Sequence, residues 1–287
     1  MQDRLAADAA AIQGHFDRVL LDFGTGPVAE AMRYATRGGK RIRGFLVRES
    51  ARLHDVPEAA TLWPATGIEA LHAYSLVHDD LPAMDDDALR RGQPTVHVKW
   101  DEATAILVGD ALQSLAFEMV AHPDCGPPAI RADLALSLAR AAGGQGMVLG
   151  QALDIAAETA ALPLTLEAIT TLQAAKTGAL ILWAATAGAR MGGGDLAPLS
   201  AYARALGLAF QIQDDVIDVT GDAHAAGKAV GKDAAAGKAT FVSLLGLEGA
   251  RARAAALVDA ADDALSCYGA RADGLRALAR FVISRQN

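Results

Sequence analysis

Five carboxylates are crowded into ten residues, HDDLPAMDDD, at positions 78–87. They directly follow the mostly apolar run IEALHAYSLV, and an unpaired carboxylate beside an apolar wall is energetically costly. Hard cations such as Mg²⁺ take oxygen ligands, usually one or two carboxylates per ion completed by water and phosphate oxygens. The cluster therefore indicates either a solvated acidic loop or a site for divalent cations.

A spacer that contains Pro82 separates Asp79 and Asp80 from Asp85 in this first cluster. Proline lacks a backbone N–H and disfavours helical geometry at the residue before it, so a regular helix should not continue through the spacer. In an unbroken helix Asp79 and Asp85 would lie on different faces. We therefore expect a local bulge that brings these two carboxylates together.

A second acidic cluster, QIQDDVID, occupies residues 211–218 within a strongly helical pattern. Asp214 and Asp218 are four residues apart and share one helix face, and Asp215 is three residues before Asp218. Such like-charge pairs destabilise an isolated helix, so something should compensate them. Either cluster alone fits an exposed acidic surface, but two clusters on facing helices would hold several Mg²⁺ ions and leave positions open for phosphate.

Positive charge is concentrated elsewhere in the sequence. The segment GGKRIR opens a helix, and its backbone N–H groups with Lys40 and Arg43 form a candidate diphosphate cradle. The other basic candidates are Arg90 and Arg91 after the first cluster, Lys176 beside Thr177 in an apolar helix, and Lys228 and Lys238 around a glycine-rich loop. Together they predict two anionic groups bound at once, one through metal ions and one through basic side chains.

The elements that must position these residues are predicted to be helices. Ala and Leu dominate the composition, aromatic residues make up 5%, and glycine or proline separates the helical patterns. The expected helices span roughly residues 3–22, 27–37, 41–53, 58–80, 101–121, 128–156, 165–189, 195–219, 238–246 and 248–283. No linker divides them, so we expect one all-α domain over residues 1–287.

Composition also argues against several classes of protein. The formal net charge of −8 argues against a nucleic-acid partner. Cys125 and Cys267 lie far apart and suggest neither a zinc site nor a disulfide framework. The N-terminus lacks the features of a signal peptide, and the apolar run at 178–189 is shorter than the ~18 residues of a membrane span. We therefore expect a cytoplasmic protein without a membrane span.

The combined motifs resemble the trans-isoprenyl diphosphate synthase family. They are GGKRIR, DDLPAMD followed by LRRG, GQALD at 150–154, KT at 176–177 and QDDVID. The sequence around the first cluster is similar to that of the bacterial farnesyl diphosphate synthases of the family. The resemblance implies an all-α bundle around a deep central cavity, normally a homodimer. It also implies a Mg²⁺-dependent 1'-4 condensation of isopentenyl diphosphate with dimethylallyl and then geranyl diphosphate, giving farnesyl diphosphate and diphosphate.

The resemblance also implies a role for each motif residue. Three Mg²⁺ ions would be ligated by Asp79, Asp85 and Asp214, with support from Asp80, Asp215 and Asp218. The allylic diphosphate would be contacted by Arg90, Lys176, Lys228 and Lys238. The diphosphate of isopentenyl diphosphate would be bound by Lys40, Arg43, His72 and Arg91. The hydrocarbon ends would meet beside Thr177 and Gln211, with Gln151 and Asp154 behind them.

Product length is expected to depend on Tyr74 and Ser75, about one turn before Asp79. The growing hydrocarbon tail should run beside the helix that carries the first cluster, so these side chains can form the floor of its shaft. An aromatic residue at the fifth position before the motif, with a two-residue insertion within the motif, resembles enzymes that stop at fifteen carbons. Ordinary core packing is the alternative role for Tyr74.

Other functions remain open at this point. Geranylgeranyl or geranyl diphosphate could be the product instead. A terpene cyclase would usually carry a different second metal motif and lack GGKRIR, and an inactive partner subunit would be expected to have lost aspartates. The pairs His54-Asp55 and His78-Asp79 also suggest an HD-type metal phosphohydrolase. That reading leaves the second cluster and the basic cradle unexplained.

Overall fold

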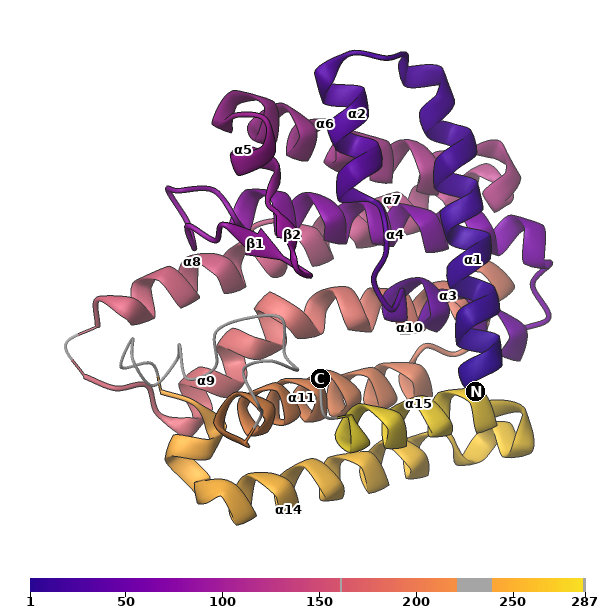
Figure 1. Ribbon diagram of the computed structural model, residues 1–287. Coiled ribbons are helices and arrows are strands. Elements are labelled where there is room, and N and C mark those ends of the chain that lie inside the picture. Colours follow the sequence, from indigo (N-terminus) through magenta and orange to yellow (C-terminus); the bar gives the residue numbers. More distant parts are fainter. Residues whose placement is uncertain (161, 221–238, 286–287) are drawn as a thin grey trace.

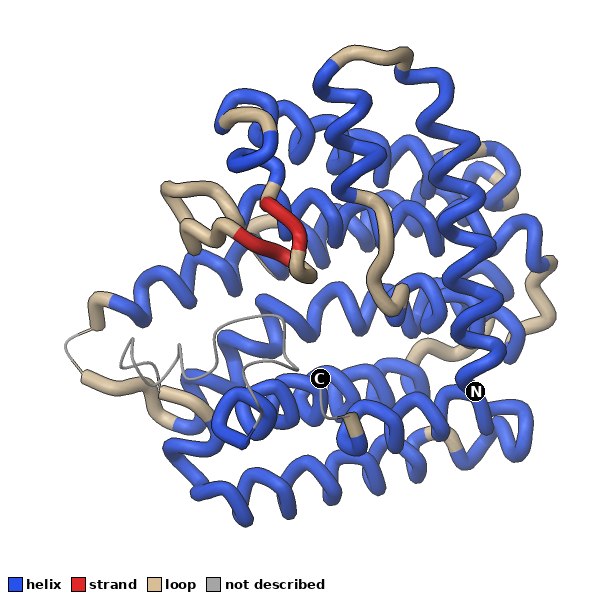
Figure 2. Tube along the Cα trace, viewed as in Figure 1, coloured by secondary structure: helices blue, strands red, loops and turns tan. Residues whose placement is uncertain are grey.

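A computed structural model describes residues 1–160, 162–220 and 239–285, so the candidates Lys228 and Lys238 lie outside the described residues. Figure 1 shows the arrangement of the elements and Figure 2 their type. The first half contains α1 (Gln2–Val19), η1 (Leu20–Phe23), α2 (Pro27–Ala35), α3 (Ile42–Leu53), α4 (Glu58–Asp79), β1 (Leu89–Arg90), β2 (Gln93–Pro94), α5 (Val96–Lys99), α6 (Glu102–Ala121) and η2 (Pro123–Cys125). The second half contains α7 (Pro128–Ala142), α8 (Met147–Glu158), α9 (Leu166–Gln173), the π-helical turn η3 (Ala174–Gly178), α10 (Ala179–Gly192), α11 (Ala197–Thr220), α14 (Phe241–Ala264), η4 (Ser266–Ala272) and α15 (Asp273–Ser284). The predicted all-α fold is confirmed.

Local capping explains where several helices begin. The carboxylate of Asp101 accepts the N–H of Thr104 at 2.7 Å at the start of α6. Thr240 and Ser243 form a reciprocal capping box at the start of α14. Because the first N–H groups of a helix have no partner within it, these side chains stabilise the ends that the sequence marks.

Helix α4 lies inside the bundle, with α3 and α6 as its main neighbours. In Figure 1, α10, α11 and α14 follow one another below it, and each contacts the next. The largest side chains of the core are fully buried and come from α1, α3 and α11: Phe16, Phe45 and Tyr202. Burying aromatic and aliphatic area of this kind supplies the main favourable term in folding. The bundle thereby fixes the ends of α4 and α11, which carry the two acidic clusters.

Several element boundaries differ from those predicted. The helix expected over 128–156 is two helices, because the segment GGQG at 143–146 interrupts it. A β-carbon at Gly146 would lie 2.0 Å from the carbonyl oxygen of Ala141. The helix expected over 248–283 is divided by η4, where Gly269 has φ 55°. The β1–β2 hairpin was not predicted, because two-residue strands give no periodic signal.

One described helix, α6, is long and apolar enough to cross a bilayer by length and composition alone. Its mean hydropathy is 1.3, and half of the qualifying window is buried inside the protein. It packs against α2, α4, α5 and α7. Since a core helix of a bundle passes the same test, this finding is weak evidence for a membrane span.

Candidate active site

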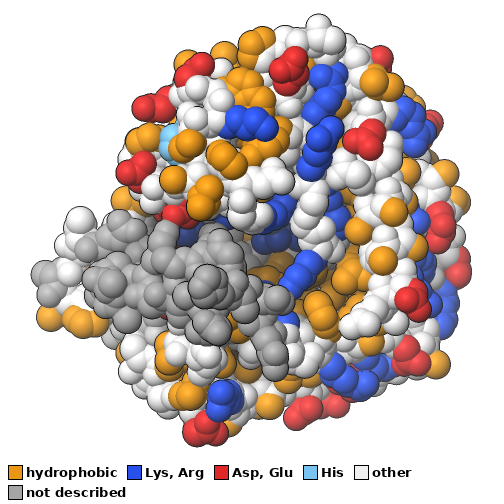
Figure 3. Space-filling model, viewed as in Figure 1, with side chains coloured by type: hydrophobic (Ala, Val, Ile, Leu, Met, Phe, Trp, Pro, Cys, Tyr) orange, Lys and Arg blue, Asp and Glu red, His pale blue; other side chains and the backbone are white. Residues whose placement is uncertain are grey.

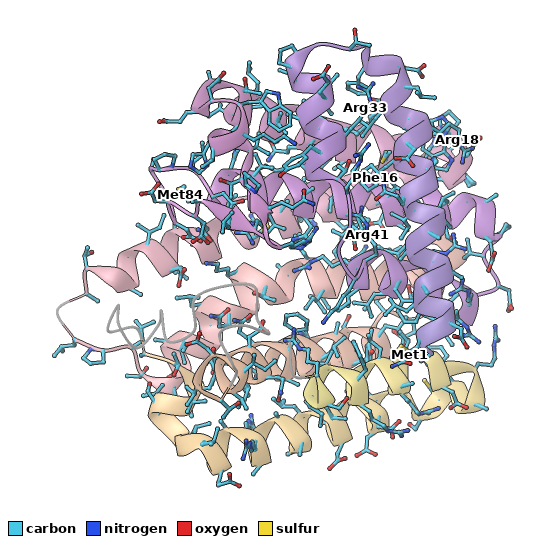
Figure 4. The ribbon with its side chains drawn as sticks, viewed as in Figure 1. Met1, Phe16, Arg18, Arg33, Arg41 and Met84 are labelled. Carbon is cyan, nitrogen blue, oxygen red and sulfur yellow. The ribbon has the colours of Figure 1, made fainter. Side chains whose placement is uncertain are left out.

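The chain turns back on itself directly after α4, as Pro82 predicts. Helix α4 ends at Asp79, and the N–H of Asp85 donates to the carbonyl oxygen of Asp79 at 2.8 Å. A second turn follows, in which the N–H of Met84 donates to the carbonyl of Leu81 at 2.9 Å. Figure 4 shows Met84 in this turn, beyond the end of α4. The bulge places the backbone of Asp85 against Asp79, so a six-residue separation no longer puts them on different faces.

The Asp79 carboxyl is electrostatically strained in the absence of a metal ion. Burial and, to a smaller extent, the negative charge of Asp85 raise its pKa to about 6, although the positive charge of Lys176 opposes the shift. A carboxylate that is both desolvated and close to another carboxylate is stabilised by a nearby cation. This environment fits a hard cation held jointly by Asp79 and Asp85.

Asp80 faces a different set of neighbours from Asp79. Its side chain is buried, and Arg90 binds it in a forked arrangement, with Nε 2.8 Å from both carboxylate oxygens and Nη2 2.5 Å from Oδ1. Such bidentate pairs fix orientation as well as charge. Asp80 therefore ties strand β1 to the end of α4 and holds the Arg90 guanidinium beside the first cluster.

The second cluster has the face pattern that its spacing predicts. Asp214 and Asp218 are both partly exposed on α11, as is Gln211, whereas Asp215 is buried. The Asp215 carboxylate accepts the N–H of Phe241 at 2.7 Å, at the first residue of α14. Asp215 thus stabilises a helix N-terminus, where negative charge is favourable.

The basic cradle is built on left-handed backbone. Gly38, Gly39 and Arg41 have φ of 71°, 83° and 52°, and α3 begins immediately afterwards. The carboxylate of Glu69 supports the turn, because it accepts the N–H of Gly44 at 2.8 Å and pairs with Arg41 at 3.6 Å. Figure 4 labels Arg41 on this loop. Glu69 was not among the predicted site residues, since no local pattern connects it to Gly44, which lies 25 residues earlier in the first turn of α3.

Two arginines of the predicted cradle reach the same region. The Nε of Arg43 is buried and has no hydrogen-bond partner among the described residues. The guanidinium of Arg91 lies over Gly39, where a β-carbon would be 2.9 Å from its Nη2. A buried donor without a partner is costly, so this position favours an incoming hydrogen-bond acceptor such as a phosphate oxygen.

A cavity of about 560 Å³ opens between the α2–α3 loop, α4 and the hairpin. Its lining includes Leu76 and Val77 of α4 together with four cations, Arg37, Arg90, Arg91 and Lys99. Figure 3 shows Lys and Arg side chains gathered in and around the hollow on this face. The positive charge of the rim attracts anions.

His72 lies on α4, in the midst of the arginines. Burial and the charges of Arg43 and Arg91 hold the pKa of His72 well below its usual value. The ring is therefore neutral at pH 7 in the unliganded protein. A neutral imidazole can donate one hydrogen bond to an anion and can take up a proton when that anion arrives.

Binding of inorganic diphosphate should therefore be accompanied by proton uptake near pH 7. The bound anion offsets the neighbouring arginines and raises the pKa of His72 from its low unliganded value. Calorimetry in two buffers of different ionisation enthalpy measures the proton count. His72→Gln keeps a hydrogen-bond donor and should remove the uptake. Equal heats in both buffers for the unsubstituted protein would contradict this assignment.

A π-helical turn places Lys176 against α8 and Thr177 against α11. Lys176 Nζ donates to the carboxylate of Asp154 on α8 at 2.6 Å, and Thr177 Oγ1 donates to Gln211 Oε1 on α11 at 3.0 Å. Gly150 of α8 lies against this turn, where a β-carbon would be 2.1 Å from the backbone nitrogen of Lys176. Turns of this kind occur frequently at functional sites. Here the turn brings together three sequence motifs that are distant in the chain.

The two chain-length candidates lie on different faces of α4. Ser75 is partly exposed, as are His72 and Asp79, so it shares their side of the helix. Tyr74 is 8% exposed, and its ring makes an edge contact with the His78 ring at 5.3 Å between centroids. The side chain of Gln113 on α6 lies near the Tyr74 hydroxyl. Tyr74 thus belongs to the α4–α6 interface.

The donor set fits a metal centre divided between two helices. Among the described residues, no three Asp, Glu, His or Cys side chains are close enough together to hold an ion on their own. The first cluster would supply Asp79 and Asp85 to such a centre, and Asp214 would supply oxygen ligands from α11. Mg²⁺ commonly takes only one or two carboxylates and completes its shell with water and phosphate. The arrangement therefore suits ions that bind together with a phosphorylated ligand.

Comparison with known proteins agrees with this geometry. Residues 26–269 match the family model described as polyprenyl synthetase. Farnesyl diphosphate synthase of Escherichia coli (strain K12) is 46% identical over 275 residues, which cover 92% of this chain and 91% of that protein. Geranylgeranyl pyrophosphate synthase 9, chloroplastic, of Arabidopsis thaliana is 42% identical over 270 residues, 91% of this chain and 74% of that protein. The apo crystal structure of an FPP/GFPP synthase from Zymomonas mobilis has a TM-score of 0.89 and 45% identity, covering 99% of this chain and 100% of the other.

Proposed function

Because the chain belongs to the polyprenyl synthetase family, and is therefore a Mg²⁺-dependent prenyltransferase, we propose that it condenses isopentenyl diphosphate with dimethylallyl and then geranyl diphosphate to give farnesyl diphosphate. The identity to the Escherichia coli farnesyl diphosphate synthase supports this product. Because other relatives are named geranylgeranyl pyrophosphate synthases, geranylgeranyl diphosphate is the alternative product.

The observation that carries the proposal is the separation of two kinds of anion site within one bundle. Carboxylates on α4 and α11 suit one diphosphate bound through metal ions. The Gly38–Arg43 cradle, with His72 and Arg91, suits a second diphosphate bound through side chains and backbone N–H groups. A single-substrate phosphohydrolase needs only one such site. In the HD-type alternative His78 would bind a metal ion, but its Nε2 already contacts the carbonyl of Ile106 on α6 at 3.1 Å, which leaves only Nδ1 for an ion.

The proposed mechanism follows from these positions. Bound Mg²⁺ would neutralise the negative charge that develops on the leaving diphosphate, and we assign three ions to Asp79, Asp85 and Asp214. Asp80 holds Arg90 beside that diphosphate, and Asp154 holds Lys176. Lys228 and Lys238 are assigned to the same group. Asp215 and Asp218 support the second cluster.

The hydrocarbon ends of the two substrates are proposed to meet beside Thr177 and Gln211. As the allylic C–O bond breaks and diphosphate leaves with the bonding electrons, the double bond of isopentenyl diphosphate attacks the allylic carbon. Transfer of a proton to the released diphosphate then restores an alkene. No side-chain nucleophile is needed for these steps. The residues of this site act by binding, by orientation and by electrostatic stabilisation of the leaving group.

We also propose a homodimer formed through α6, α7 and α8. These helices carry many exposed large apolar side chains: Ile106, Leu107, Leu136, Val148, Leu149, Leu153 and Ile155. Large exposed apolar patches mark interaction sites. A second copy presenting the same helices would cover it by two-fold symmetry.

Residues 1–287 are proposed to form one catalytic domain. A cytoplasmic location is proposed as well. Both cysteines are free, with Cys125 buried and Cys267 exposed, which suits a reducing compartment.

The proposed activity is tested by incubating the protein with Mg²⁺, labelled isopentenyl diphosphate and either dimethylallyl or geranyl diphosphate. Chromatography of the products should show label in a fifteen-carbon diphosphate with both allylic substrates, and none after addition of excess chelator. Release of phosphate without incorporation of label would instead indicate a hydrolase. A twenty-carbon product would support the geranylgeranyl alternative.

Replacing Tyr74 by alanine should lengthen the main product toward twenty carbons. The substitution removes a buried ring at the α4–α6 interface, so space opens beside the proposed shaft. Mass spectrometry of the products measures the change, and Tyr74→Phe serves as a control that keeps the ring and loses only the hydroxyl. An unchanged product profile for the alanine variant would show that Tyr74 is a packing residue only.

A further inference from the structure

The second acidic cluster has a cation from the C-terminal end of the chain. Arg285 Nη2 lies 2.5 Å from Asp214 Oδ1, and the Arg285 side chain is only 9% exposed. Asp214 is one of the three residues to which the proposed function assigns metal binding. This ion pair was not anticipated from the sequence, because α11 and the C-terminus are 71 residues apart.

Arg285 is held by several contacts with α11. Its Nη2 also donates to the carbonyl of Phe210 at 3.1 Å, and the guanidinium carbon lies 3.9 Å from the centre of the Phe210 ring. Gln213 Nε2 donates to the backbone carbonyl of Arg285 at 3.1 Å. The backbone is thus anchored independently of the side chain, so the guanidinium can leave Asp214 while the chain stays in place.

We propose that Arg285 is the internal counter-ion of Asp214 and must move away from this carboxylate before Mg²⁺ binds there. This inference rests on the proposed function, because it takes Asp214 as a metal ligand. The cluster on α11 carries like charges at i and i+4, and a guanidinium in short contact offsets them in the metal-free enzyme. A divalent ion at the same carboxylate would repel that guanidinium strongly, since both are cations within a few ångströms.

The place to which Arg285 can move is indicated by its neighbours. Burial and, after it, the positive charge of Arg285 lower the pKa of Lys40, whose Nζ lies 5.9 Å from the centre of the Phe281 ring on α15. Arg285 is therefore already close to the basic cradle. If the Arg285 guanidinium left Asp214, its positive charge would be available to a diphosphate bound in the basic cradle. Metal binding at one diphosphate site would thereby strengthen anion binding at the other, and by linkage the reverse also holds.

The test is the affinity of the protein for Mn²⁺ alone, measured by electron paramagnetic resonance of the free ion. Arg285→Gln should bind Mn²⁺ about tenfold more tightly than the unsubstituted protein, because the competing cation is gone. The Mn²⁺ affinity of Arg285→Lys should lie between those of the unsubstituted protein and Arg285→Gln. Arg280→Gln is the matched control, because it also removes one positive charge near the C-terminal end of the chain. Arg280 pairs with Asp262 at the surface, so the Mn²⁺ affinity of this variant should equal that of the unsubstituted protein.

The outcomes separate this inference from the proposed function. Equal or weaker Mn²⁺ binding by Arg285→Gln, with circular dichroism and melting temperature retained, would overturn the role of Arg285. An equal gain in Arg280→Gln would also overturn it, since the effect would then be one of net charge. If Asp214→Asn leaves Mn²⁺ affinity unchanged, the metal assignment in the proposed function fails first.

Discussion

Replacing Asp79 by asparagine should lower the turnover number by about 10²- to 10³-fold and raise the melting temperature of the metal-free protein at pH 7.5. The turnover loss follows because a carboxylate that stabilises developing charge through a metal ion is removed. Steady-state incorporation of labelled isopentenyl diphosphate measures the first effect, and a thermal melt in the presence of chelator measures the second.

The rise in stability follows from the sign of the pKa shift at Asp79. Burial raises this pKa from 3.8 to about 6, so between these values the folded state binds more protons than the unfolded state. Stability of the metal-free protein therefore falls as pH rises through this window, and the full penalty is present above pH 6. Asparagine carries no charge, so the variant should lose this contribution to the pH dependence between pH 4 and 6.

Asp86→Asn is a matched control for Asp79→Asn. Asp86 is exposed in the same turn and has φ 50°, a conformation that asparagine tolerates well. It should keep both the rate and the pH dependence of the unsubstituted protein. A near-native rate for Asp79→Asn, or a loss of stability in it at pH 7.5, would contradict the role of Asp79.

Replacing Gly150 by alanine should reduce turnover by about 10²-fold, although the residue carries no chemical group. A β-carbon there would lie 2.1 Å from the nitrogen and 2.4 Å from the Cα of Lys176, so α8 or the π-helical turn must shift. Lys176 and Thr177 would move with the turn, and displacements of about 1 Å can cost this much in an oriented reaction. Overpacking should also destabilise the fold by about 1–3 kcal/mol.

Gly144→Ala provides the comparison for Gly150→Ala. Gly144 precedes the same helix, and a β-carbon there would meet no atom within 4 Å. This variant should retain turnover and stability. If Gly150→Ala behaves in the same way, the close approach of α8 does not position Lys176.

The sequence predicts those parts of the site that depend on local spacing. The proline in DDLPAMD predicts that the helix ends near residue 80, and α4 ends at Asp79. The i, i+4 spacing on α11 predicts a shared face for Asp214 and Asp218. The basic segment GGKRIR predicts a helix start that carries Lys40 and Arg43, although the structure adds left-handed Arg41. These predictions hold because a helix or a turn is defined by residues that are close in the chain.

The remaining parts depend on packing between distant segments. The carboxylate of Glu69 supports the cradle from α4, and Arg285, the residue after α15, reaches Asp214 on α11, so neither gives a local signal. The π-helical turn at Lys176 reads as ordinary apolar helix in the sequence. Tyr74 is adjacent to Ser75, but helical geometry directs it to α6 and leaves Ser75 on the side of Asp79.

The claim that two acidic clusters form one divided metal centre is tested most directly by a double-mutant cycle. The measurement is kcat/KM for Asp79→Asn, Asp214→Asn and the double variant with geranyl and isopentenyl diphosphate at saturating Mg²⁺. If the clusters act as a unit, each single variant should lose about 10²- to 10³-fold, and the double variant should be little worse than either. Losses that multiply in the double variant would show two independent sites and contradict the account.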